Sequence, residues 1–168
     1  GYELFKYDGT TLTAVDVNAG TGDSWPEYLT NVSGVLYFRA YTPATGHELF
    51  KYDGTALTAI DVSPGIDPAN PQYLTDIGGV LYFNAYTPTT SWELFKYNGI
   101  TLTGYDVESA TGDSNPSDFV QVGSVVYFTA YADTTGLELF KYDGTTLTAI
   151  DVNAGTDSSG PANLTVVG

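Results

Sequence analysis

Residues 22–26 read GDSWP and contain the Gly-Asp-Ser sequence that surrounds the nucleophilic serine of several hydrolases. A serine nucleophile needs a base, and it needs a third group that orients the base. His47 is the only histidine of the 168 residues, and no Gly-x-Ser-x-Gly sequence is present. Alanine or serine occupies the place of Ser24 at 45-residue intervals, as Ala69, Ser114 and Ser159. We therefore predict a turn before Pro26 and no catalytic serine.

Carboxylates are the next candidates for catalysis, because the chain has 20 Asp and Glu. A glycosidase needs two carboxylates in different environments, one of them with a raised pKa. The prominent carboxylates instead recur every 45 residues, as Glu3, Glu48, Glu93, Glu138 and Asp16, Asp61, Asp106, Asp151. We expect each copy to have the same surroundings, and we expect the carboxylates to solvate strand ends and turns at the surface. The sequence predicts no acid–base pair, and we expect the chain not to be an enzyme.

Oxygen-bearing residues at alternate positions mark three Gly-rich loops as candidate calcium sites. The candidate ligands are Asp16, Asn18, Asp61, Asp67, Asp151, Asn153 and Asp157. A calcium loop wraps its ion in this alternating way, with side-chain and backbone oxygens. However, no glutamate closes a twelve-residue loop, and Asp and Asn also cap their own backbone in turns. Calcium is therefore a candidate cofactor, and backbone capping by Asp and Asn is the alternative. The sequence predicts no cofactor that the protein requires.

Four of the five basic residues are lysines that also recur every 45 residues, as Lys6, Lys51, Lys96 and Lys141. In so acidic a chain we expect them to pair with neighbouring carboxylates. Partly exposed pairs of this kind contribute about 0–1 kcal/mol each. The alternative is a row of lysines that binds an anion.

Two tryptophans and the histidine are candidate ligand-binding residues. The equivalents of Trp25 are Asn70, Asn115 and Gly160, whereas Trp92 and His47 share one variable position. Positions that vary between otherwise matching units are expected to be exposed, so these side chains mark a candidate face for a carbohydrate or protein ligand. The alternative is scattered surface aromatics. Asn31 and Asn163 begin Asn-x-Ser/Thr sequences and are candidate glycosylation sites.

Composition narrows the classes of partner and location. The formal net charge is −15 and the pI is about 4.1, which argues against nucleic acid and anionic membrane surfaces. Hydrophobic residues make up 42% of the chain, so a folded core is expected. There is no cysteine, no apolar run long enough to span a membrane, and no signal-peptide pattern at the first residues.

An internal repeat of 45 residues determines the expected architecture. ELFKY begins at Glu3, Glu48, Glu93 and Glu138, which gives repeats at 3–47, 48–92 and 93–137 and an incomplete one at 138–168 in a single domain. Each repeat is expected to hold four strands, in the second repeat 48–52, 57–62, 72–77 and 80–86. A type I′ turn is expected at 53–54 and a second turn at 78–79. Four strands in a unit of this length predict an all-β fold, a β-propeller with one blade per repeat. We expect seven phenylalanines to pack between the blades: Phe5, Phe38, Phe50, Phe83, Phe95, Phe128 and Phe140.

The repeat resembles the ELWxxDGT repeat of secreted and surface bacterial proteins. The motif is ELFKYDGT at 3–10, 48–55 and 138–145, and ELFKYNGI at 93–100. The DINPG loop and lYFsA strand of that family match 16–20 and 36–40, and phenylalanine stands where the family has tryptophan. The resemblance covers the whole chain. It implies a propeller with the strand after the proline innermost, loops such as 18–25 crossing between blades, and an extracellular setting without a defined activity.

We expect a non-catalytic extracellular module for adhesion or ligand binding. The alternative is a structural subunit of a fibre in which a strand of one chain completes a sheet of another. Gly168 aligns with Gly123, so the twelve positions that correspond to 124–135, one strand, are not in the sequence. A longer protein with more repeats explains this more simply than self-association, and both remain open.

Overall fold

A computed structural model describes residues 1–109 and 112–167. Gly168, which aligns with Gly123, lies outside the described residues. The described part is all β, without a helix, and no segment of it forms a helix that could cross a membrane. Its 14 strands form four antiparallel sheets, here called sheets I to IV in chain order. The prediction of an all-β fold is confirmed.

The sheets follow the repeat. Sheet I contains β1 (Leu4–Tyr7) and β2 (Leu12–Val15). Sheet II contains β3 (Glu27–Val32), β4 (Val35–Thr42), β5 (Gly46–Tyr52) and β6 (Leu57–Ile60). Sheet III contains β7 (Gln72–Ile77), β8 (Val80–Thr87), β9 (Ser91–Tyr97) and β10 (Leu102–Tyr105). Sheet IV contains β11 (Ser117–Val122), β12 (Val125–Ala132), β13 (Gly136–Tyr142) and β14 (Leu147–Ile150).

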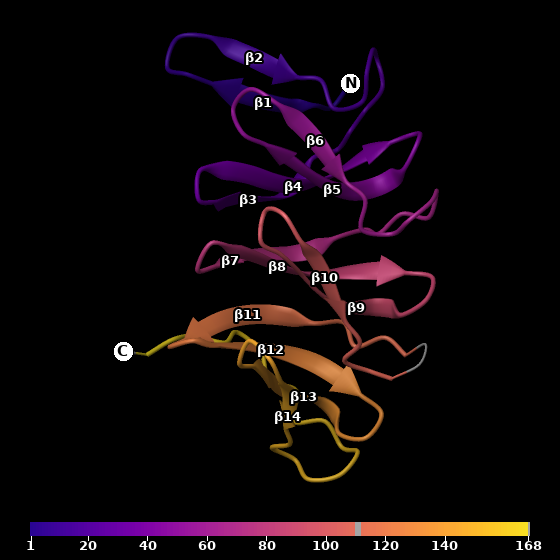
Figure 1. The fold of residues 1–168 in the computed structure, drawn as a ribbon, viewed down its shortest axis with the longest axis vertical. Helices are drawn as coiled ribbons and strands as arrows, with labels where there is room; N and C mark the ends of the chain where they lie inside the picture. Colours follow the sequence, from indigo (N-terminus) through magenta and orange to yellow (C-terminus); the bar gives the residue numbers. More distant parts are fainter. Residues whose placement is uncertain (110–111, 168) are drawn as a thin grey trace.

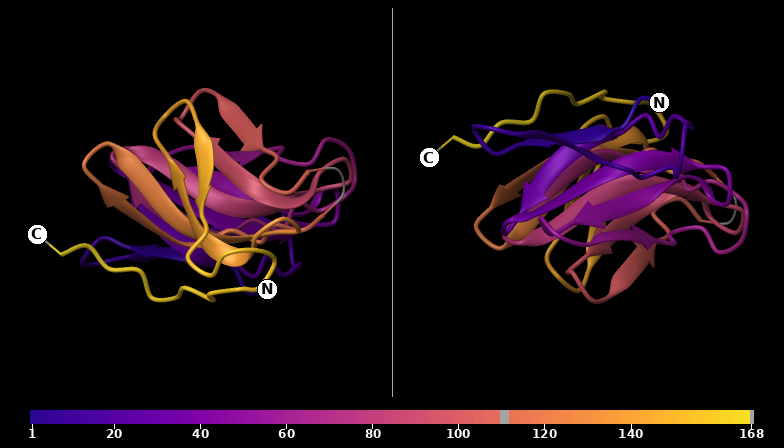
Figure 2. Two further views of the ribbon diagram at one scale, coloured as in Figure 1. Left: turned by 90° about the horizontal axis from the view of Figure 1, so that it is seen from below. Right: turned by 90° about the horizontal axis from the view of Figure 1, so that it is seen from above.

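The four sheets are stacked in chain order. Figure 1 shows sheet I at one end of the stack and sheet IV at the other, with the remaining two between them. Figure 2 looks along the stack from both ends and shows successive sheets rotated relative to one another. The first strands of neighbouring sheets lie closest, since β3 contacts β7 and β7 contacts β11. Sheets II and III therefore each have one face toward the preceding sheet and one toward the following sheet.

The two predicted hairpin turns have different outcomes. Ile77 pairs with Val80, and Gly78 and Gly79 have φ of 60° and 83°, which matches a two-residue turn with both residues left-handed. The turn after β5 is different, because Tyr52 pairs with Leu57 and leaves a four-residue loop. The prediction of a type I′ turn at 53–54 is therefore wrong.

Asp53 explains this longer loop. Its Oδ1 accepts the backbone N–H groups of Thr55 (2.8 Å) and Ala56 (2.7 Å), so the side chain closes the turn. The hydrogen bonds from Ala56 and then from Thr55 lower the pKa of Asp53 to about 2. The equivalent Asp8 and Asp143 make the same contacts.

Apolar packing between the sheets forms the core. Phe38 and Phe50 are register partners on β4 and β5, with ring centroids 5.9 Å apart. They lie on the face of sheet II that packs on Leu4 of sheet I, and we call this the Phe face. The opposite face of sheet II carries Tyr37 and Leu49, which belong to one cluster with the phenylalanines of sheet III. We call that face the Tyr/Leu face.

Sheets III and IV repeat this arrangement, with Phe83 and Phe95 on one Phe face and Phe128 and Phe140 on the next. Six of the seven predicted phenylalanines are therefore buried between sheets. Phe5 is the exception, with 54% of its surface exposed. It lies on the Phe face of sheet I, which no other sheet of the described chain covers.

A buried glutamate fixes the loop that leads from each sheet to the next. Glu48 is 1% exposed, and its Oε2 accepts the N–H of Val62 (3.1 Å) while its Oε1 accepts the N–H of Ala69 (2.8 Å). Val62 follows β6 and Ala69 precedes β7, so one carboxylate holds both ends of the crossing loop. Glu93 and Glu138 bind the equivalent groups of their own loops.

The burial of these glutamates corrects the sequence analysis. The equivalent aspartates, such as Asp61, are exposed as expected, whereas Glu48, Glu93 and Glu138 are not surface carboxylates. The physical reason is that backbone N–H groups of the loop lose water and cannot pair within a sheet. A carboxylate has two acceptor oxygens and can bind two separate N–H groups, one on each. A side-chain amide or hydroxyl has a single acceptor oxygen.

We predict that Glu48→Gln lowers the free energy of unfolding by about 1–3 kcal/mol, because the amide nitrogen would face an N–H that has lost its acceptor. Urea unfolding at pH 8 measures this difference. Asp67→Asn is the matched control, since it also removes one negative charge but at an exposed position of the same loop. Equal stability of the two variants would contradict the role of Glu48.

Candidate functional site

Three of the aromatic side chains form a partly exposed cluster in sheet II. The ring centroids of Trp25 and Tyr41 are 5.6 Å apart, and those of Tyr41 and His47 are 5.3 Å apart. Trp25 precedes β3, while Tyr41 and His47 are register partners on β4 and β5. We call this group the Trp25 cluster. The structure thus brings two of the three predicted ligand-binding residues together, through a tyrosine that the sequence analysis did not select.

The third predicted residue, Trp92, lies in sheet III. Its ring centroid is 5.9 Å from that of Tyr86, its register partner on β8. Trp92 therefore occupies the place that His47 has in sheet II. The recurrence of tyrosine at 41, 86 and 131 was the signal that could have revealed these partners.

Backbone contacts position the indole of Trp25. The N–H groups of Ser24 and Trp25 both donate to the carbonyl oxygen of Tyr2, at 2.8 and 3.3 Å. The N–H of Tyr41 donates to the carbonyl oxygen of Ser24 at 2.7 Å. Trp25 has φ of 43°, and 46% of its surface is exposed. The loop is thus held on two sides while the indole projects toward solvent.

His47 supplies a polar group beside these rings. Burial, and then the charge of Arg39, lower the pKa of His47, whereas Glu27 acts in the opposite direction. The imidazole is therefore neutral at pH 7. Its Nδ1 is buried and has no hydrogen-bond partner among the described residues. A neutral imidazole can donate from one nitrogen and accept at the other.

Ser24 takes part in the glutamate arrangement of its own loop. It is fully buried, and its hydroxyl lies 2.7 Å from Oε2 of Glu3 and 3.2 Å from the carbonyl oxygen of Tyr2. The hydroxyl of Ser114 makes the same contact with Glu93 at 2.7 Å. These serines add a donor to the carboxylate, and their contacts are with groups that hold the loop.

The equivalent glutamates differ in pKa, contrary to the expectation of identical surroundings. Burial raises the pKa of Glu48 and of Glu93 to about 7, although the hydrogen bonds that they accept act against it. At Glu138, burial is the largest single influence and raises the pKa. The combined hydrogen bonds from Ser159, Val152 and Asn153 nevertheless bring it below the ordinary value. Their structural role is shared, whereas their titration is not.

Two of the four repeated lysines contact tyrosines of the following sheet. Lys6 Nζ donates to Tyr52 Oη at 3.0 Å, and Lys96 Nζ donates to Tyr142 Oη at 2.9 Å. The described residues, 1–109 and 112–167, contain one ion pair, between Arg39 and Glu27. No lysine takes part in it, so the prediction that these lysines pair with carboxylates is wrong. A tyrosine that serves as acceptor explains why lysine and tyrosine both recur.

The candidate calcium loops bind their own backbone. Asp16 Oδ2 accepts the N–H of Gly20 at 3.4 Å, and Asp151 Oδ2 accepts the N–H of Gly155 at 3.2 Å. Asn18 Nδ2 donates to the carbonyl oxygen of Asp23 at 2.9 Å. The described residues contain no group of three acidic or histidine side chains placed to hold a metal. Calcium binding by these loops stays a prediction.

The candidate glycosylation sites are both exposed. The Oδ1 of Asn31 accepts the N–H of Gly34 at 2.9 Å in the turn after β3. The backbone N–H of Asn163 donates to Asp118 Oδ2 at 3.1 Å. Their use as acceptors stays a prediction.

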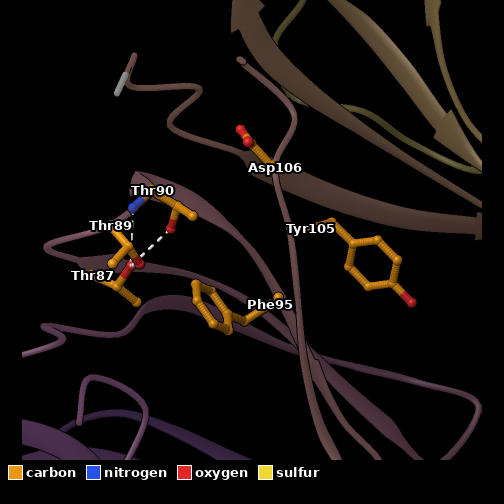
Figure 3. A pocket seen from close by; sticks show the side chains of 7 residues that line it. Thr87, Thr89, Thr90, Phe95, Tyr105 and Asp106 are labelled. Carbon is orange, nitrogen blue, oxygen red and sulfur yellow. Dashed lines mark hydrogen bonds between the residues drawn. The ribbon is translucent and has the colours of Figure 1, made fainter. Parts of the chain in front are cut away.

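Sequence reasoning missed a cavity of about 250 Å³ in sheet III. It is lined by Thr87, Thr89, Thr90, Phe95, Gly104, Tyr105 and Asp106. Figure 3 shows the threonine hydroxyls turned toward one another and the ring of Tyr105 pointing away from them. The signal was Gly104, because the other repeats have alanine there. A Cβ at Gly104 would lie 2.8 Å from the Phe95 ring.

Comparisons with known proteins found no matching family model, curated protein or solved structure. The similarity to ELWxxDGT repeats therefore stays a prediction from the motif.

We predict that the protein is more stable near pH 5 than at pH 8. The pKa of Glu48 and of Glu93 is about 7 in the folded chain and 4.5 without burial, so the folded state binds more protons between these values. Stability therefore falls as the pH rises through this window, by about 3 kcal/mol per carboxylate. Below pH 4, protonation of Asp8, Asp53 and Asp143 destabilises the fold, because their pKa is about 2.

Urea unfolding across pH 3–8 measures this profile. We expect a maximum between pH 4 and 5, and a flatter decline above it in Glu48→Gln, which has lost one titrating group. Asp67→Asn should keep the profile of the parent chain. A free energy of unfolding that rises steadily from pH 5 to pH 8 would contradict the pKa assignments.

Proposed function

We propose that the chain is a non-catalytic extracellular binding module whose ligand, a carbohydrate, contacts the Trp25 cluster. The observation that carries this proposal is the exposed indole of Trp25 beside Tyr41 and the neutral imidazole of His47. The apolar face of a sugar ring packs on an aromatic side chain, and nearby polar groups bind its hydroxyls. A net charge of −15 disfavours polyanionic ligands.

Trp92 and Tyr86 extend this surface to the next sheet. Tyr86 and Trp92 are register partners on β8 and β9, at the positions that Tyr41 and His47 have on β4 and β5. A polymer that follows the stack would meet one such pair on sheet II and one on sheet III. We infer that the ligand is an oligosaccharide that spans at least two sheets.

We further propose that the stacked sheets are consecutive blades of a β-propeller. Three four-stranded antiparallel sheets in chain order, each packed on the next through apolar faces, support this architecture. The extracellular location rests on the similarity of ELFKYDGT to the repeat of secreted proteins and on the acidic composition.

Trp25→Ala is predicted to weaken oligosaccharide binding by about fivefold to a hundredfold, since about 1–3 kcal/mol of stacking is lost with the indole. A glycan array of neutral bacterial and plant oligosaccharides identifies the ligand, and calorimetry on the best one measures the dissociation constant. Trp92→Ala should weaken long oligosaccharides more than disaccharides. Ile100→Ala is the control, because Ile100 is 90% exposed on a turn away from these rings. Binding that survives both tryptophan substitutions would exclude this surface.

The second candidate is a fibre subunit completed by strand exchange. The observation that favours it is the course of residues 162–167, which run along sheet IV without forming a strand in the described chain. Leu164 lines a cavity with Tyr127 and Leu139, so the segment lies against the sheet without being one of its strands. Backbone groups in such a place are a template for a strand from another chain.

A synthetic peptide of residues 124–135, SVVYFTAYADTT, is predicted to bind the 168-residue chain and to reduce its self-association. Fluorescence anisotropy of the labelled peptide measures binding, and a scrambled peptide of equal composition is the control. Equal affinity for both peptides would remove strand exchange from the account.

A further inference from the structure

The cavity of about 250 Å³ in sheet III combines hydroxyl groups with an apolar wall. Thr87, Thr89 and Thr90 form one side of it, at the end of β8 and in the turn that follows (Figure 3). The other side contains Phe95 and Gly104 of the neighbouring strands. Cavities that bind drug-sized molecules measure about 300–1,000 Å³, so this one has the size for a single small ring.

The three threonine hydroxyls keep some of their hydrogen-bonding capacity. The Oγ1 of Thr87 lies 3.1 Å from that of Thr89 and 2.8 Å from that of Thr90. It also accepts the backbone N–H of Thr90 at 3.2 Å. A hydroxyl has one donor and two acceptor lone pairs. Three donors enter two hydroxyl–hydroxyl bonds, so these contacts leave one donor and several lone pairs for a ligand.

Gly104 creates the space beside the ring of Phe95. The two residues are register partners on β10 and β9. In the other repeats the partner of the equivalent phenylalanine is an alanine, at positions 14, 59 and 149. A Cβ at Gly104 would lie 2.8 Å from Cε1 of Phe95, which is closer than packed carbon atoms come. The Phe95 ring and the cavity thus occupy the space that a methyl group takes in the other sheets.

Tyr105 anchors the wall without filling the cavity. Its ring points away from the threonines in Figure 3, and its hydroxyl lies 2.7 Å from Tyr142 Oη in sheet IV. Aliphatic residues occupy the equivalent position in the other repeats, as Val15, Ile60 and Ile150. The contact with Tyr142 holds the backbone on either side of Tyr105, which belongs to Gly104 and Asp106.

Sheet III combines features that the repeat elsewhere keeps apart. The equivalents of the three threonines are Thr42, Ala44 and Thr45 in sheet II, and Ala132, Thr134 and Thr135 in sheet IV. Each of those sheets therefore lacks one hydroxyl and has alanine in place of Gly104. In sheet IV the buried Oγ1 of Thr135 has no hydrogen-bond partner among the described residues. Two independent departures from the repeat thus meet at one cavity.

We propose that this cavity binds one pyranose ring of a neutral sugar. The C–H face of the ring packs on Phe95 and Gly104, as sugar rings pack on aromatic side chains. Its hydroxyls bind the threonines and the carboxylate of Asp106, which has two acceptor oxygens for neighbouring hydroxyls. The net charge of −15 and the carboxylate in the wall disfavour acidic sugars.

This site is separate from the surface assigned to the oligosaccharide. Side chains alternate along a strand, and Leu94 packs toward sheet IV whereas Phe95 packs toward sheet II. Trp92 shares the face of Leu94, so it lies on the opposite face of β9 from the cavity. The inference goes beyond the proposed function and does not require the Trp25 cluster to bind. Trp25→Ala should leave binding in the cavity unchanged.

Amide chemical shifts of the 168-residue chain, labelled with ¹⁵N, test the proposal. The probes are neutral hexoses and N-acetylhexosamines, each as the free sugar and as its methyl glycoside. The two forms distinguish a free monosaccharide from the terminal residue of a glycan. We expect saturable shifts at Thr89, Thr90 and Gly104, with a dissociation constant of about 1 mM for a ligand of this size.

The test variants use residues that the other repeats already contain. Gly104→Ala places a methyl group in the cavity and should weaken binding at least tenfold. Gly104 has no positive φ, so its backbone accepts alanine. Thr89→Ala should weaken binding about fivefold, because one hydrogen bond is lost. It also serves if Gly104→Ala fails to fold, which circular dichroism melting checks. Thr134→Ala is the matched control in sheet IV and should bind like the parent chain.

The reverse substitutions should transfer the site to sheet II. Ala44→Thr combined with Ala59→Gly gives that sheet the hydroxyls and the glycine of sheet III, so the chain should bind two sugars instead of one. The proposal is overturned by the absence of saturable shifts at the cavity for all of these sugars up to about 50 mM. An unchanged affinity in folded Gly104→Ala or Thr89→Ala, or a folded double variant that still binds one sugar, would also overturn it. Shifts at the cavity with methylammonium and with no sugar would show a cation site instead.

Discussion

The hydrogen bonds between a buried glutamate and the backbone of the crossing loop determine how one sheet leads to the next. Each crossing segment must leave the outer strand of a sheet and reach the first strand of the following one, where its N–H groups have no strand to pair with. Glu48 binds the N–H groups at both ends of this segment, and Glu93 and Glu138 do the same. One buried carboxyl group per repeat thus supplies the acceptors that a neighbouring strand would otherwise provide.

Packing of the sheets follows from this constraint. Because the loop returns to the same place in every repeat, the Phe face of each later sheet lies on the Tyr/Leu face of the sheet before it. Lysine and tyrosine side chains then meet at the rim, as Lys6 and Tyr52 do. The same regularity places Tyr41 beside His47 in sheet II and Tyr86 beside Trp92 in sheet III.

The repeat made the sheets predictable and left the environments of single residues undetermined. Strands were predicted from short apolar runs between turns, and four per repeat were found in sheets II to IV. The burial of Glu48 could not be read from its type, because glutamate is normally exposed and its partners lie 14 and 21 residues away. Phe5 is exposed because no other sheet of the described chain covers it, and its sequence motif is the same as that of the buried copies. The positions of Trp25 and His47 differ between repeats, which marks them as candidate binding residues. Tyr41, which joins them, recurs in every complete repeat, so its variation gives no such signal.

Hydrogen exchange of the crossing-loop amides is the most direct measurement of the glutamate arrangement. NMR at pH 8, where the Glu48 carboxylate is ionised, would follow the N–H groups of Val62 and Ala69, which donate to Glu48, and that of Ile66, which lies exposed between them. The account predicts that Val62 and Ala69 exchange as slowly as amides within β8, and that Ile66 exchanges fast. Equally fast exchange at all three positions would contradict it.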